Sequence, residues 1–268
     1  MLKLKEKILE FFYSIPRVLF INFFKLFVRI RVFSLENIPD DRSAILAINH
    51  TTGADPIVLL GAVDKKIYFM ASARNFGTRF TNFFMRRFTN SLPVFQEKPI
   101  KNTATFRELF SIAKRDNVLV GIFPEGKLNK KGKLESFHNG AAYLSFKTRL
   151  PIIPVYMHNL RKGASSKSFF ARSNVAEGII SIIANTFRRI NVFIGDPINP
   201  TAEEIANDFR DLVDTKSYRA AIDDINRALI KAFSELEEEA GGVFTPDDDS
   251  VDPLQHPLPD KPGGLFEN

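Results

Sequence analysis

Short apolar runs alternate with longer amphipathic segments through the middle of the chain. The runs have the length of buried strands, and the segments between them repeat apolar residues with the period of a helix. This alternation is typical of an α/β fold, a mainly parallel sheet with helices on both faces. The pattern predicts strands over residues 44–49, 66–71, 92–95, 117–123, 151–157 and 191–198, and helices over 55–63, 103–115, 141–148, 202–213 and 217–240.

The first thirty residues follow a different pattern, in which Phe, Leu and Ile are interrupted by Lys and Arg. The charges are too frequent for a signal peptide or a clean spanning helix. A Phe-rich helix face opposite Lys and Arg is typical of a helix that lies in the plane of a membrane surface. A helix packed on the protein's own core has the same pattern, and a tilted or re-entrant segment also fits it. We predict that residues 1–41 form an amphipathic, membrane-associating helical segment.

Charge is distributed unevenly along the chain. The net charge of the whole chain is +6, but the first 234 residues, with 36 basic and 21 acidic side chains, carry +15. A basic body favours an anionic partner, such as a phosphorylated substrate or an acidic membrane. No recognised nucleic-acid-binding motif accompanies the charge, so we expect no nucleic-acid partner. Without cysteine, the 268 residues have no disulfide, thiolate zinc site or cysteine nucleophile.

The end of the chain differs again, because residues 241–268 are acidic and rich in Pro and have few apolar positions. Such a composition cannot bury enough apolar surface to fold. We therefore predict a domain over residues 42–240 that is large enough to hold a catalytic site, followed by an acidic, Pro-rich disordered tail.

The first candidate for chemistry is NHTTGADP, residues 49–56, between a predicted strand and a predicted helix. If Gly53 lets the turn fold back, the Asp55 carboxylate can reach the His50 ring. The carboxylate would then fix the ring tautomer and make the other ring nitrogen a better base. The alternative is that Asp55 only caps the helix, with Pro56 in its first turn.

The second candidate is FPEGK, residues 123–127, which also follows a predicted strand. Parallel strands direct their carboxyl ends to the same sheet edge, where ligands bind. The two candidate segments therefore converge in the predicted fold. Free backbone N–H groups and nearby lysines suit a phosphate, although an ordinary solvated loop is also rich in lysine. The lysines concerned are Lys127, Lys130, Lys131 and Lys133.

The pair of motifs resembles the glycerolipid acyltransferase superfamily, specifically the 1-acylglycerol-3-phosphate O-acyltransferase (lysophosphatidate acyltransferase) family. In this sequence the resemblance rests on His50 and Asp55, and on FPEG about seventy residues later. It extends to residues 132–142, 150–155 and 194–198, and covers the chain from about residue 42 to residue 200 in the family's order and spacing.

The resemblance implies that His50 is the general base and that Asp55 orients it. The base would deprotonate the free hydroxyl of a lysophospholipid, which attacks an acyl thioester, with acyl-CoA or acyl carrier protein as co-substrate. This chemistry needs no metal and no other cofactor. Phe123, Pro124, Glu125 and Gly126 would bind the glycerol-phosphate end of the acceptor, most simply 1-acylglycerol-3-phosphate.

Two positions depart from the family's pattern. Lys127 and Leu128 stand where the family has Thr or Ser and then Arg, and Gln96 stands where it has Arg. A lysine binds phosphate less directionally than an arginine. Arg74, Lys98 or Lys127 would supply the charge, or the acceptor is a different lysolipid that lacks the phosphomonoester. A non-catalytic membrane-binding relative is the remaining alternative. In each case we expect a membrane-associated protein at the cytoplasmic face.

Overall fold

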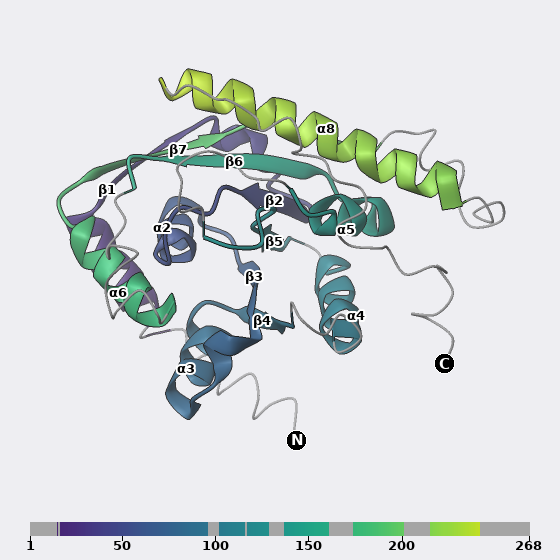
Figure 1. Cartoon of the computed structure of the whole chain (residues 1–268). Helices are drawn as coiled ribbons and strands as arrows, with labels where there is room; N and C mark the ends of the chain where they lie inside the picture. The colour runs from purple at the N-terminus through teal and green to yellow at the C-terminus, as the bar shows by residue number, and fades with distance from the viewer. Residues whose placement is uncertain are drawn as a thin grey trace.

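One seven-stranded sheet forms the centre of the molecule (Figure 1). The computed structural model describes residues 15, 17–95, 102–115, 117–128, 137–160, 174–200 and 215–241. The spatial order of the strands is β1-β7-β6-β2-β5-β3-β4. Their bounds are β1 (Arg29–Phe33), β2 (Ala44–Ile48), β3 (Ile67–Ser72), β4 (Ser91–Val94), β5 (Leu119–Ile122), β6 (Ile152–His158) and β7 (Arg189–Ile194).

Neighbouring strands pair in parallel, with the exception of the antiparallel pair β6 and β7. Because β1 is parallel to β7, these two strands run opposite to the other five. The mainly parallel α/β sheet predicted from the sequence is confirmed.

Helices cover both faces of the sheet, as predicted. One core contains side chains of α4, α5 and α8, and the other contains side chains of α2 and of a helix over residues 17–27. Figure 1 shows α8 extended along one face and α2 on the other. The helices are α2 (Asp55–Ala62), α3 (Arg79–Phe83), α4 (Thr103–Ala113), α5 (Gly140–Thr148), α6 (Asn174–Ala184) and α8 (Thr215–Glu239), with short turns η1 (Leu35–Asn37) and η2 (Ala73–Phe76) and the π-helical η3 (Phe84–Phe88).

Three sequence predictions fall partly or wholly outside the described residues. They are the helix over 202–213, the start of the N-terminal segment, and nearly all of the acidic tail. Within the described ranges, no helix combines the length and apolar character needed to cross a bilayer.

Strand β2 is the buried central strand that leads into the first candidate motif. All five of its residues are buried. Leu46 and Ile48 pack in the core that contains α2, whereas Ile45 and Ala47 pack in the core that contains α5 and α8. A parallel strand covered on both faces reads as an unbroken apolar run, which is why AILAI was recognisable. The strand delivers the residues that follow it, 49 and 50, to the carboxyl edge of the sheet.

Strand β1 was not predicted from the sequence. The prediction of a helical segment over residues 1–41 included this region and is wrong for residues 29–33. In the structure the helix covers residues 17–27, and residues 29–33 pair in register with residues 189–193 of β7. Arg29 and Arg31 alternate with Ile30 and Val32, and the half-buried pattern of an edge strand follows from that alternation.

Candidate active site

The connection between β2 and α2 is organised by one buried carboxylate, that of Asp55. It accepts hydrogen bonds from the backbone N–H groups of Thr51 at 2.8 Å and Thr52 at 3.0 Å, and from the Thr52 hydroxyl at 2.6 Å. Asp55 is the first residue of α2, but its carboxylate faces back to the preceding turn, and the N-cap position is Ala54. Asp55 therefore stabilises the turn that precedes α2 and does not act as the N-cap of that helix.

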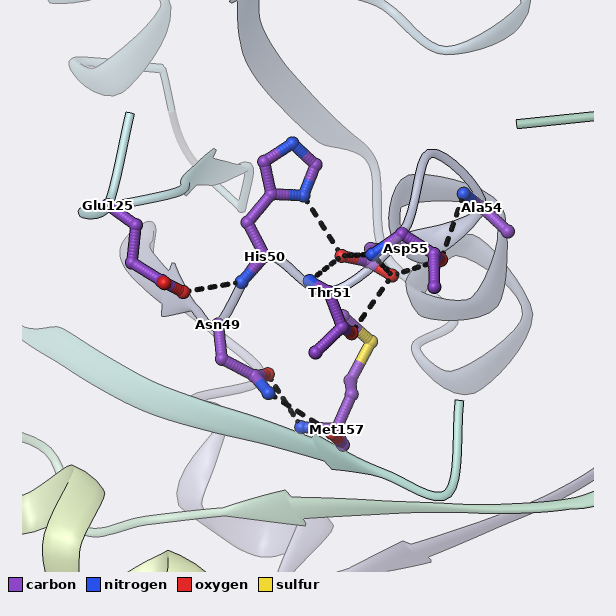
Figure 2. A network of polar contacts seen from close by, with 8 residues as sticks. Asn49, His50, Thr51, Ala54, Asp55, Glu125 and Met157 are labelled. Carbon is purple, nitrogen blue, oxygen red and sulfur yellow. Dashed lines mark hydrogen bonds and ion pairs between the residues drawn. The ribbon is translucent and has the colours of Figure 1, made fainter. Parts of the chain in front are cut away.

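The same carboxylate holds the ring of His50. Nδ1 of His50 lies 2.9 Å from Oδ2 of Asp55, so the ring N–H donates to the carboxylate. Asp55 is 0% exposed, and the His50 side chain is 19% exposed. Figure 2 shows the second ring nitrogen directed away from Asp55. This geometry fixes the tautomer and leaves Nε2 as the proton acceptor, which is the arrangement of an oriented general base.

The turn after β5 brings the second motif against this histidine. The ring of Phe123 stacks on the imidazole, with 4.0 Å between ring centroids and 25° between planes. Oε1 of Glu125 accepts the backbone N–H of His50 at 2.9 Å, as Figure 2 shows. The structure thus places both motifs at one edge of the sheet, as the parallel arrangement predicted.

Gly126 closes the turn of the second motif. Its φ of +63° lies in the left-handed region, and a Cβ at this position would lie 2.6 Å from Cδ2 of His138. His138 is held nearby because its backbone N–H donates to the carbonyl of Pro124 at 2.8 Å. Gly126 is therefore required both for the backbone conformation and for the close approach of an imidazole.

Replacing Gly126 with alanine is expected to lower the free energy of unfolding by about 1–3 kcal/mol, since it adds left-handed strain and a steric contact. Thermal unfolding measures this change. Gly140→Ala, at the start of α5, is the matched control, because nothing lies within 4 Å of a Cβ there. A Gly126→Ala protein as stable as the control would contradict the prediction.

Two of the predicted cationic residues, Lys127 and Arg74, are described by the structure and lie at this edge of the sheet. Lys127 is exposed directly after Gly126, and Arg74 is exposed in η2, just beyond the carboxyl end of β3. In the sheet, β3 is separated from β2 by β5 alone. Lys98 lies outside the described residues, as do Gln96, Lys130, Lys131 and Lys133.

Two polar residues beside the site were given no role by the sequence analysis. The carboxamide of Asn49 accepts the backbone N–H of Met157 at 2.8 Å and donates to the Met157 carbonyl at 3.1 Å. Thr52 donates its hydroxyl to Asp55 and accepts the N–H of Ala54 at 3.1 Å. Asn49 could have been identified from the sequence, because it is a polar residue directly after a buried apolar strand, and a buried polar side chain needs a hydrogen-bond partner.

Behind the site, Tyr156 on β6 donates a hydrogen bond to Glu237 on α8 at 2.9 Å. Burial raises the pKa of the Tyr156 phenol, and the neighbouring Glu237 and Glu125 carboxylates act in the same direction. Burial also raises the pKa of the Glu237 carboxyl, against the opposing effects of Tyr156 and His158. The pair ties the long C-terminal helix to the strand that ends beside the site.

The sequence profile of the acyltransferase family matches residues 29–158, from the start of β1 to the end of β6. The chain is therefore similar to the acyltransferase family over 130 of its 268 residues. The match contains both motifs of the site, and it includes strand β1. Within the described ranges of the chain, no group of three or more His, Asp or Glu side chains is placed to hold a metal ion.

Similar proteins carry a more specific name. The chain is 25% identical over 174 residues to a 1-acyl-sn-glycerol-3-phosphate acyltransferase of Borreliella burgdorferi, covering 62% of this chain and 63% of that protein. A Bacillus subtilis protein of the same name is 20% identical over 210 residues, 78% of this chain and 90% of its own length. The chain thus spans slightly less than two thirds of the Borreliella relative.

A solved structure has the same fold. The crystal structure of the 1-acyl-sn-glycerophosphate acyltransferase PlsC of Thermotoga maritima superposes with a TM-score of 0.53 at 19% sequence identity. The similarity covers 84% of this chain and 82% of that one. At this identity the likeness supports the fold of the chain alone.

Proposed function

We propose that the protein transfers a fatty acyl group from an acyl thioester to the free hydroxyl of a lysophospholipid. The preferred acceptor is 1-acylglycerol-3-phosphate, and the product is then phosphatidate. The observation that carries the proposal is the His50–Asp55 pair, an oriented base at the carboxyl edge of the sheet, in the region that matches the acyltransferase family. The names of the bacterial relatives support the choice of acceptor.

The proposed reaction needs one positioned base and an activated ester. Nε2 of His50 takes the proton of the acceptor hydroxyl as its oxygen attacks the thioester carbonyl. The tetrahedral intermediate collapses, the carbon–sulfur bond breaks, and the thiolate of CoA or acyl carrier protein leaves. The imidazolium returns its proton to the thiolate. Asp55 stabilises the positive charge on the ring between these two steps.

The acceptor phosphate requires cationic partners near His50. Lys127 and Arg74 are exposed at the same sheet edge, and we assign the phosphate to them, with Lys98 as a third candidate. Leu128 and Gln96 stand where the family's pattern has arginine, so a lysine would bind the phosphate less directionally. A lysolipid without the phosphomonoester is therefore the second candidate acceptor.

A panel of acceptors tests the proposal. Purified protein in mixed micelles receives oleoyl-CoA or oleoyl carrier protein, together with lysophosphatidate or a lysophospholipid with a larger headgroup. We expect transfer to lysophosphatidate with the highest kcat/KM. Transfer to the other acceptors alone would exclude the preferred substrate, and folded, micelle-bound protein without any transfer would exclude the function.

We further propose that the protein binds an anionic membrane surface, on the cytoplasmic face, through the helix over residues 17–27. Apolar side chains of this helix are exposed although a core is available on its other side, where Ile21 and Phe24 are buried. Leu26 is 78% exposed, Leu19 64% and Phe23 60%. An apolar helix face flanked by Lys and Arg suits the interface between headgroups and acyl chains.

Replacing Phe23 and Leu26 together with serine is expected to weaken binding to vesicles about tenfold or more, because two apolar side chains no longer enter the bilayer. Sedimentation with vesicles that contain phosphatidylglycerol measures the change. Leu35→Ser is the control, since Leu35 is 45% exposed but lies beyond the other end of β1. Equal binding by the double variant and the control would contradict this role of the helix.

A further inference from the structure

The main-chain ladder of β2 ends just before His50. Pairing with β5 ends at Ala47 opposite Ile122, and pairing with β6 ends at Ile48 opposite Val155. The last main-chain bond to β6 runs from the N–H of Asn49 to the carbonyl of Val155, at 3.3 Å. Buried N–H groups beyond that point need acceptors from elsewhere.

Side chains replace the ladder on both sides of β2. Toward the turn after β5, a carboxylate oxygen of Glu125 accepts the N–H of His50 at 2.9 Å. Toward β6, the Asn49 carboxamide pairs with both backbone polar groups of Met157, at 2.8 and 3.1 Å, as a peptide group would. Figure 2 shows both contacts flanking the main chain at residues 49 and 50. The backbone that carries the base is thereby fixed from two directions.

Both the burial and the charge of Glu125 argue against its binding the phosphate of the acceptor. The residue is 1% exposed, and its Oε1 atom is directed at the His50 main chain. An anionic carboxylate also repels an anionic phosphate. The cations Lys127 and Arg74, by contrast, are exposed at the sheet edge.

We propose that Glu125 is a positioning residue for His50, and that its carboxylate stands in for a strand carbonyl rather than binding the acceptor. Asp55 fixes the ring of His50 and Glu125 fixes its backbone. This role rests on the proposed acyl transfer, and it differs from the acceptor-binding role that the family resemblance implies for Glu125.

Two variants of Glu125 distinguish the roles kinetically. Glu125→Gln keeps an oxygen that can accept the His50 N–H, so we expect kcat to fall by less than about fivefold, as a neutral acceptor replaces a charged one. Glu125→Ala leaves that N–H without its acceptor and releases the main chain. We expect kcat to fall roughly ten- to hundredfold, with acceptor KM changed less than about threefold. Glu108→Ala, at an exposed position on α4, is the matched control.

Amide hydrogen exchange tests the same contact without any activity. The chain has four His, so selective ¹⁵N-histidine labelling gives at most four backbone signals, and His50→Ala identifies that of residue 50. We expect slow exchange of this amide in the wild type and in Glu125→Gln, and exchange at least about tenfold faster in Glu125→Ala. The other histidine amides report whether the fold is intact.

The outcomes are distinct. A raised acceptor KM at unchanged kcat in both Glu125 variants would overturn the positioning role, as would an His50 amide that exchanges equally slowly in Glu125→Ala. Recovery of kcat and of slow exchange in the glutamine variant supports it. If the wild type transfers no acyl group, the proposed function fails, and hydrogen exchange alone still decides whether Glu125 holds His50.

Discussion

Replacing His50 with alanine is expected to lower kcat for acyl transfer roughly 10²- to 10⁴-fold, the usual contribution of a general base. The free energy of unfolding should change by about 1 kcal/mol or less. Asp55 loses one donor, the His50 ring, but keeps the backbone N–H groups of Thr51 and Thr52. The base is therefore separable from the turn that presents it.

His50→Gln sharpens this test. Glutamine offers a hydrogen-bond donor to Asp55 but no group that takes up a proton near neutral pH. If His50 acts as the base, the glutamine and alanine variants should be equally slow in the micelle assay. If His50 only ties the turn to Asp55, the glutamine variant should recover activity, and that recovery would refute the proposed role. Circular dichroism and thermal unfolding confirm that both variants are folded.

The strands at the centre of the sheet could be predicted because a strand that is buried on both faces is a short, continuous run of apolar residues. β2 and β5 are covered on both faces, and all their residues are apolar or glycine. Strand direction has no such local signal. The reversal between β6 and β7 depends on how the chain returns through α6, and an apolar run has the same composition in either direction.

β1 was missed for a related physical reason. It follows the Phe-rich helix over residues 17–27 after a single residue, so the apolar pattern continues across the boundary. At the edge of the sheet only one side is paired, and exposed arginines occupy alternate positions. An edge strand with basic residues beside a basic amphipathic helix gives little contrast in charge or hydropathy.

In the site, the local contact was predictable and the distant ones were not. His50 and Asp55 are five residues apart, and the turn between them brings their side chains together at 2.9 Å. Glu125 and Met157 reach the same turn from 75 and 108 residues away. Parallel topology predicted that the FPEG turn would approach His50. It could not predict that Glu125 is directed at the main chain of His50, because the order of strands in a sheet does not determine which way a side chain in the following turn points.

Replacing Asp55 with asparagine is expected to reduce both activity and stability, unlike the change at His50. The buried carboxylate accepts from two backbone N–H groups, the Thr52 hydroxyl and the His50 ring. An asparagine turns one of its two acceptor oxygens into an NH₂ group that faces donors. We expect the free energy of unfolding to fall by about 2–4 kcal/mol and kcat to fall roughly 10²- to 10⁴-fold, because the ring loses its orienting partner.

Denaturant unfolding and the acyl-transfer assay together measure the two effects of Asp55→Asn. Asp64→Asn makes the same chemical change at an exposed position just after α2 and should alter neither quantity. A variant that loses kcat but keeps wild-type stability would show that Asp55 acts on the His50 ring alone and that the turn holds its shape without the carboxylate. A variant that loses stability but keeps kcat, measured well below its unfolding midpoint, would remove Asp55 from the mechanism. Loss of both is expected, because a single buried carboxylate contacts the ring of the base and the backbone of the turn that carries it.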